Sequence, residues 1–183
     1  MTPLARHFLT ALATLSVIVA APLLAAQSAN DLFDRAQTQA QAENKDILMV
    51  FSASWCGPCH LYEHFLQDPQ MKAINDRAFV VVRIDVGEEF GHDHSHVNTP
   101  GGTELRTALG AVGEPGFPFI VITSPSGKPI VNSYRKGKTD ANVGYPAAPE
   151  EIDWYIKMLK DVPAISPADL AATRDWLKQH NPH

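Results

Sequence analysis

The sequence predicts an α/β fold in which a central mixed β-sheet is flanked by helices. Two apolar segments, 47–53 and 78–86, indicate buried strands, and the second of them carries four valines. Helical patterns between these segments favour a parallel pairing of the two strands. Segments 119–123 and 129–134 are joined by turn residues 124–127, which predicts an antiparallel hairpin later in the chain.

The elements are expected in the order helix, strand, helix, helix, strand, helix, strand, strand, helix, helix. Asn30 or Asp31 can cap the first helix, whose apolar residues recur at helical spacing up to about Glu43. Asp68 and Pro69 are typical of the cap and the first residue of another helix, which reaches about residue 76. The remaining helices are expected over about 56–66, 103–109, 148–160 and 167–180.

Residues 1–26 are typical of a secretory signal peptide. Basic residues precede an apolar stretch over 8–24, and the segment ends in alanines of the kind found at a cleavage site. The alternative is a retained membrane anchor, because the apolar stretch is almost long enough to span a bilayer. We therefore expect a periplasmic or secreted protein whose folded part comprises residues 27–183.

The formal net charge of −5 comes without any basic cluster or stripe, which argues against nucleic acid as a partner. The chain has only two cysteines, Cys56 and Cys59. An exported protein held together by disulfides would contain more of them. These two cysteines are therefore expected to be reactive rather than structural.

The two cysteines belong to the motif Trp55-Cys56-Gly57-Pro58-Cys59, which follows an apolar strand directly and opens a helix. A pair in this position predicts a dithiol redox site. Free backbone N–H groups and the positive end of the helix dipole would stabilise a thiolate at Cys56. Cys59 lies one helical turn further on and can close a short disulfide with it, so the motif predicts thiol–disulfide chemistry.

At this motif, and at Gly116-Phe117-Pro118 before the strand 119–123, the chain resembles the thioredoxin superfamily. The resemblance covers about residues 29–160. It is strongest to exported thioredoxin-like domains, such as the C-terminal domains of membrane disulfide-reductant transporters. It implies a thioredoxin fold for residues 27–183, with a leading helix, an inserted histidine-rich loop and an extra C-terminal helix. In that last helix, Trp176 and Leu177 should pack back onto the core.

The resemblance also implies a role for each residue of the two motifs. Cys56 would attack a substrate disulfide, and Cys59 would resolve the mixed disulfide that results. Pro118 would follow a cis peptide bond beside the active site. Phe117 is bulkier than the family's usual residue before this proline. The substrate would contact Trp55, Gly57, Pro58, Phe117 and Pro118.

The pair Gly57-Pro58 resembles that of the reducing members of the superfamily. We therefore expect a thiol–disulfide oxidoreductase that reduces disulfides in substrate proteins and receives its electrons from a membrane thiol donor. The Cys56–Cys59 disulfide would be its redox centre, without a further cofactor. The protein is expected to act as a monomer.

The proton acceptor that thioredoxins use is missing from this sequence. The family places a buried carboxylate six residues before the first cysteine, where this chain has Val50. The lysine partner expected on the next strand is replaced by Val81. Glu63 and His60, on the helix that starts at the dithiol, are candidate substitutes. They can equally belong to a solvated helix face.

Residues 87–102 form a polar, glycine- and histidine-rich loop that a minimal thioredoxin lacks. His92, His94 and His96, with Asp93 beside them, are candidate metal ligands. We adopt the simpler interpretation of a solvated polar loop without a metal. A loop of this length can also gate the access of partners to the dithiol.

Three other functions share parts of this pattern. The segment 56–60 also matches the Cys-x-x-Cys-His signal of c-type haem attachment, with His60 as an axial ligand, although nothing suggests a haem pocket. The segment 60–64 matches a zinc-peptidase motif, in a chain much shorter than such enzymes. A thioredoxin-fold binding or chaperone module with a metal-binding histidine loop is disfavoured by the presence of both cysteines.

Overall fold

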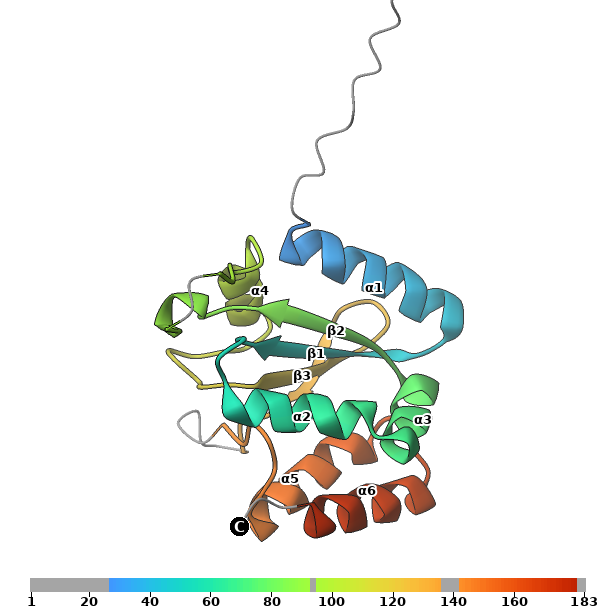
Figure 1. Ribbon diagram of the computed structural model, residues 1–183. Helices are drawn as coiled ribbons and strands as arrows, with labels where there is room; N and C mark the ends of the chain where they lie inside the picture. The colour runs from blue at the N-terminus through green and yellow to red at the C-terminus, as the bar shows by residue number, and fades with distance from the viewer. Residues whose placement is uncertain (1–26, 93–94, 136–141, 181–183) are drawn as a thin grey trace, which may run out of the picture.

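The computed structural model describes residues 27–92, 95–135 and 142–180 and contains a four-stranded sheet between layers of helices (Figure 1). The strand order is β2-β1-β3-β4, in which the first two strands are parallel and the other pairings are antiparallel. The mixed sheet, its early parallel pair and its late hairpin confirm the predictions from the sequence. The strands are β1 (Asp46–Ser52), β2 (Phe79–Asp85), β3 (Phe119–Thr123) and β4 (Pro129–Asn132).

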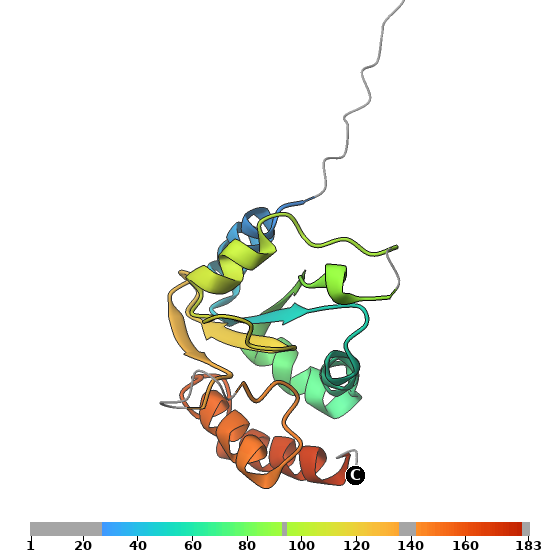
Figure 2. The same cartoon turned by 90° about the vertical axis from the view of Figure 1, so that its left-hand side faces the viewer.

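Successive side chains of β1 point to opposite faces of the sheet, as the strand period requires. Ile47, Met49 and Phe51 are packed in one core cluster with α1 (Ala29–Glu43) and α4 (Gly102–Ala108). Leu48 and Val50 are packed in the other cluster, against the remaining helices. Figure 2 shows α1 and α4 on one side of the sheet and the last two helices on the other. The helices of this second layer are α2 (Gly57–Gln67), α3 (Pro69–Ala78), α5 (Pro149–Lys160) and α6 (Pro167–Gln179).

The structure corrects the expected start of the first helix. Its cap is Ser28, not Asn30 or Asp31, because Ser28 and Asp31 form a reciprocal capping box. The Oγ of Ser28 accepts a hydrogen bond from the Asp31 N–H, and a carboxylate oxygen of Asp31 accepts one from the Ser28 N–H. Asp31 is therefore part of the cap, three residues inside the helix.

Two other segments differ in detail from the sequence-based expectation. The loop that follows β2 contains the short 3₁₀ helix η1 (Glu88–Phe90). The last strand ends at Asn132, and Tyr134 instead makes an isolated bridge with Asn142. Neither difference is visible in the local sequence pattern.

The C-terminal helix packs onto the core as predicted. Leu177 is fully buried, and the ring of Trp176 lies 5.3 Å from that of Phe65 on α2. The predicted signal peptide, residues 1–26, lies outside the described residues. Within the described ranges, no helix has the length and apolar character needed to cross a membrane.

Candidate active site

Three segments of the chain meet at one edge of the sheet. The parallel strands β1 and β2 end at this edge, and β3, which runs in the opposite direction, begins there. The N–H of Val86 donates to the carbonyl of Ser52 at 2.8 Å, and Phe119 pairs with Phe51. The Cys-x-x-Cys motif, the loop after β2 and the Gly-Phe-Pro segment are therefore brought together by the strand directions alone.

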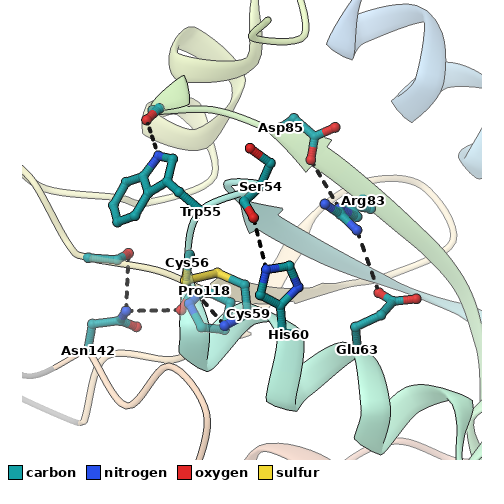
Figure 3. The surroundings of a disulfide bond; sticks show 12 residues. Ser54, Trp55, Cys56, Cys59, His60, Glu63, Arg83, Asp85, Pro118 and Asn142 are labelled. Atoms are coloured by element: carbon teal, nitrogen blue, oxygen red, sulfur yellow. Dashed lines mark hydrogen bonds and ion pairs between the residues drawn. A yellow bond between two sulfur atoms is a disulfide. The ribbon is translucent and has the colours of Figure 1, made fainter. Parts of the chain in front are cut away.

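The two cysteines form a disulfide at the N-terminus of α2 (Figure 3). Their Cα atoms lie 5.2 Å apart, and Cys56 is the N-cap residue of the helix. The Sγ of Cys56 accepts a hydrogen bond from the N–H of Cys59 at 3.2 Å. In the reduced protein the same N–H group and the helix dipole favour a thiolate at this position. Both residues are nearly covered, with exposed fractions of 3% and 6%.

Pro118 lies beside the disulfide, and the Phe117–Pro118 peptide bond is cis, the isomer that the resemblance implied (Figure 3). Asn142 holds the backbone here, because its side-chain amide donates to the carbonyl of Pro118 at 3.0 Å and to that of Gly116 at 3.4 Å. The amide oxygen of Asn142 accepts in turn from the hydroxyl of Ser133. Sequence reasoning missed Asn142, which follows the hairpin and carries no motif.

The structure explains how a phenylalanine fits before Pro118. The Phe117 ring lies edge-on to Trp55 with 6.0 Å between ring centroids, and the buried guanidinium of Arg106 lies 5.6 Å from its centre. A Cβ atom placed on Gly87 would come within 2.7 Å of the ring. Gly87 has a φ of 78°, in the left-handed region that favours glycine. The bulkier side chain is thus accommodated by a glycine in the loop after β2.

The same loop contacts the residues that precede the dithiol. The side chain of Glu88 accepts hydrogen bonds from the N–H of Ser54 at 2.7 Å and from its hydroxyl at 2.6 Å. The indole N–H of Trp55 donates to the carbonyl of Gly87 at 2.8 Å. Sequence reasoning treated the loop as solvated, yet Glu88 has an exposed fraction of only 3%. The position of a carboxylate directly after a buried strand was the one available signal.

The two candidate proton acceptors point away from the sulfurs in different directions (Figure 3). The carboxylate of Glu63 lies 3.9 Å from the guanidinium of Arg83, and its side chain is 43% exposed. The Nε2 of His60 lies 2.9 Å from the carbonyl oxygen of Ser54. Val50 is buried in the apolar cluster below the sheet, as expected for a position that has lost its carboxylate.

The geometry of the described residues gives little support to the metal-binding and haem alternatives. His94 and Asp93 lie outside the described residues, whereas His92 and His96 are exposed. Within the ranges that the structure describes, no three His, Cys, Asp or Glu residues are grouped as metal ligands would be. The expectation of a polar loop without a metal, and the alternative that its histidines bind one, therefore stay untested. Haem attachment would need both thiols free for thioether bonds, and here the two sulfurs are bonded to each other.

Comparison with known proteins gives a family and a set of similar structures. A family model described as thioredoxin-like matches residues 28–125. No curated protein matches the sequence. The disulphide isomerase from Xylella fastidiosa Temecula1 aligns over 88% of this chain and 97% of its own, with 21% identity and a TM-score of 0.52.

Two further solved structures align with lower scores. DsbH oxidoreductase shares 18% identity over 81% of this chain and 96% of its own, with a TM-score of 0.48. The C-terminal domain of DsbD from Neisseria meningitidis, in its oxidised form, shares 20% identity over 72% of this chain and 97% of its own, with a TM-score of 0.44. At identities of 18–21%, similarity to these structures is evidence for the fold alone.

Proposed function

The chain belongs to the thioredoxin-like family, and we propose that it is an exported thiol–disulfide oxidoreductase that reduces disulfides in substrate proteins. The observation that carries the proposal is the disulfide at the N-terminus of α2, with Pro118 beside it. A dithiol in this position has its thiolate stabilised by the helix, which is what nucleophilic attack on a disulfide requires.

The reaction consists of two exchanges of sulfur–sulfur bonds. The thiolate of Cys56 attacks one sulfur of a substrate disulfide, a Cys56–substrate bond forms, and the other substrate sulfur leaves as a thiolate that takes up a proton. The thiolate of Cys59 then attacks Cys56, the Cys56–Cys59 disulfide forms, and the second substrate sulfur is released. The substrate gains two electrons and the protein loses two.

Substrate binding is assigned to the surface around the sulfurs. Trp55 is 44% exposed and packs edge-on against Phe117, so the two rings form an apolar wall beside the dithiol. Gly57 and Pro58 are exposed at the start of α2. The backbone of Phe117, before Pro118, would hydrogen-bond an extended substrate segment. Trp55, Gly57 and Pro58 are exposed where a substrate sulfur must arrive, whereas Phe117 is half-buried and Pro118 is buried.

Export and the supply of electrons complete the proposal. Residues 1–26 would direct the chain out of the cytoplasm, and residues 27–183 would form the working domain. In an oxidising compartment a reductase needs an electron donor, for which we propose a membrane thiol protein. The protein would need no cofactor beyond its own disulfide, and it would act as a monomer.

The first test is trapping of the mixed disulfide. Cys59→Ser should accumulate a covalent adduct with a disulfide-containing protein, because the resolving thiol is absent, whereas Cys56→Ser should form none. Mass spectrometry under non-reducing conditions reads both outcomes. An adduct that forms equally with Cys56→Ser would refute the assigned order of attack.

The second test decides the direction of the reaction. The equilibrium of the Cys56–Cys59 pair with glutathione, followed by the fluorescence change of the neighbouring Trp55, gives its reduction potential. A value of about −270 mV supports a reductase, and one of about −120 mV would make the protein an oxidant that inserts disulfides.

Glu63 and His60 are the candidates for proton transfer to and from Cys59, and either would have to leave its present contact, with Arg83 or with the Ser54 carbonyl, to reach that sulfur. Glu63→Gln and His60→Ala are compared with the parent protein over a range of pH in a disulfide-reduction assay. The variant that removes the acceptor should lose the corresponding limb of the rate profile, whereas a residue on a solvated helix face should leave the profile unchanged.

A further inference from the structure

Glu88 is a buried acid that the reaction described above does not use. It lies in η1, directly after β2 reaches the edge of the sheet at the dithiol. Both oxygens of its side chain accept a hydrogen bond, one from the N–H and one from the hydroxyl of Ser54. An ionised carboxylate is a pure acceptor, so both of these bonds suit its charged form.

The loop after β2 contacts the turn that places Cys56. The N–H of Cys56 donates to the carbonyl of Ala53 at 3.2 Å, which closes a turn with Ser54 and Trp55 as its central residues. Glu88 holds the first central residue, and the carbonyl of Gly87 holds the indole of the second. Both central residues of the turn before the attacking cysteine are thus fixed from one neighbouring loop.

Glu88 is itself held in place from the far end of the same loop. Its N–H donates to the side-chain oxygen of Asn98 at 2.9 Å. The N–H of Thr99 donates to the carbonyl of Asp85 at 2.8 Å, and the N–H of Asp85 donates to the hydroxyl oxygen of Thr99 at 3.1 Å. The position of the carboxylate therefore rests on the strand and on both ends of the loop.

We propose that Glu88 is a positioning residue for Cys56, which acts through Ser54 by holding the turn from which Cys56 attacks. The inference rests on the proposed function of the dithiol. Small displacements of a reacting atom have large effects on rate, because the attacking and leaving sulfurs must lie in line. Without the carboxylate, the turn loses two hydrogen bonds and the N–H of Ser54 loses its partner.

The test measures the rate at which Cys56 attacks a small neutral disulfide. Reduced full-length protein is mixed with dithiodipyridine, and the release of the coloured thione is followed in the first turnover. Glu88→Ala is expected to slow this reaction about ten-fold. Glu88→Gln should keep most of the rate, because the amide oxygen can accept from the Ser54 N–H while the amide group donates to the Ser54 hydroxyl.

Two further variants separate positioning from loss of structure. Glu89→Ala alters the exposed neighbouring acid of the same turn, which also contacts Asn98, and should leave the rate unchanged. Ser54→Ala removes one of the two contacts and should have a smaller effect. In combination with Glu88→Ala it should add nothing further, because both residues act through one interaction. Denaturant unfolding of each variant shows that the folded protein is being assayed.

The outcomes are distinct. If the parent protein fails to react at all, the proposed function falls. If the parent protein reacts and Glu88→Ala reacts equally fast, the positioning role falls while the function stands. A Glu88→Gln variant as slow as Glu88→Ala would also overturn the inference, because charge rather than position would then be responsible.

Discussion

Gly87 leaves the space in which the Phe117 ring lies beside the dithiol, and its replacement by alanine tests that relation. The new Cβ would lie 2.7 Å from two ring carbons of Phe117, closer than side-chain carbons are found in folded proteins. The ring has little room to retreat, since Trp55 lies against one side of it and Arg106 against another. Gly87→Ala should therefore destabilise the protein and displace the residue before the cis-proline.

The expected magnitude has two parts. A left-handed backbone conformation at a φ of 78° costs alanine about 1 kcal/mol relative to glycine. Forcing extra volume into a packed site costs about 1–3 kcal/mol more. The free energy of unfolding should fall by about 2–4 kcal/mol in total, as measured by guanidinium chloride denaturation.

The chain offers a matched control in Gly101. This residue has a φ of 75°, and a Cβ placed on it would have no atom within 4 Å. Gly101→Ala should therefore cost only the backbone part, about 1 kcal/mol. In a Phe117→Ala background, Gly87→Ala should cost no more than this control does. Equal destabilisation by Gly87→Ala and Gly101→Ala in the parent protein would refute the steric argument.

Three other predictions follow from buried polar groups and caps. The hydroxyls of Tyr62 and Tyr155 are hydrogen-bonded at 2.9 Å in the core, so each single change to phenylalanine should cost about 1–2 kcal/mol, and the double variant clearly less than the sum, in a double-mutant cycle. Burial raises the pKa of Asp46, and its Oδ2 has no hydrogen-bond partner among the described residues. Asp46→Asn should therefore raise the unfolding free energy by roughly 1 kcal/mol at pH 7, a gain that disappears once acid protonates the parent carboxyl. Hydrogen bonding from Ser166 lowers the pKa of Asp169, so its contribution to stability exists at neutral pH and is lost as pH falls through the lowered pKa. Asp169→Asn should lack that acid-dependent loss in denaturant titrations below about pH 4, and an unchanged acid limb would contradict the assignment.

The sequence alone was sufficient for the parts of the fold that depend on local pattern. Strand β1 has a continuous apolar run because both faces of it are buried, and the helix that follows begins at a residue whose side chain caps it. The hairpin of β3 and β4 follows from a short turn. The redox pair was predictable because the two cysteines stand where a strand gives way to a helix, and this position is itself visible as a change of apolar period.

The surroundings of the dithiol could not be predicted in the same way. Glu88 and Asn142 are polar residues in loops; the place of Glu88 shortly after a buried strand is a weak local signal, and Asn142 has none. Their roles depend on which strand ends meet at which edge of the sheet, and this is a property of the pairing between β1, β2 and β3. The cap of the first helix was misplaced for a smaller reason, since Asp31 is a good capping residue in its own right but serves Ser28 here.

The extra C-terminal helix has a consequence for how the protein responds to a change of redox state. Trp176 of α6 packs edge-on against Phe65 near the end of α2, and Arg77 of α3 forms an ion pair with Asp169 of α6. The far end of α2 thereby packs against α6, which is itself held to α3, while the first turn of α2 contains the disulfide. The change in structure that accompanies opening or closing of the disulfide should then be confined to that first turn. Amide hydrogen exchange should accordingly differ between the oxidised and reduced protein around Cys56–Cys59 and stay the same in the last turn of α2.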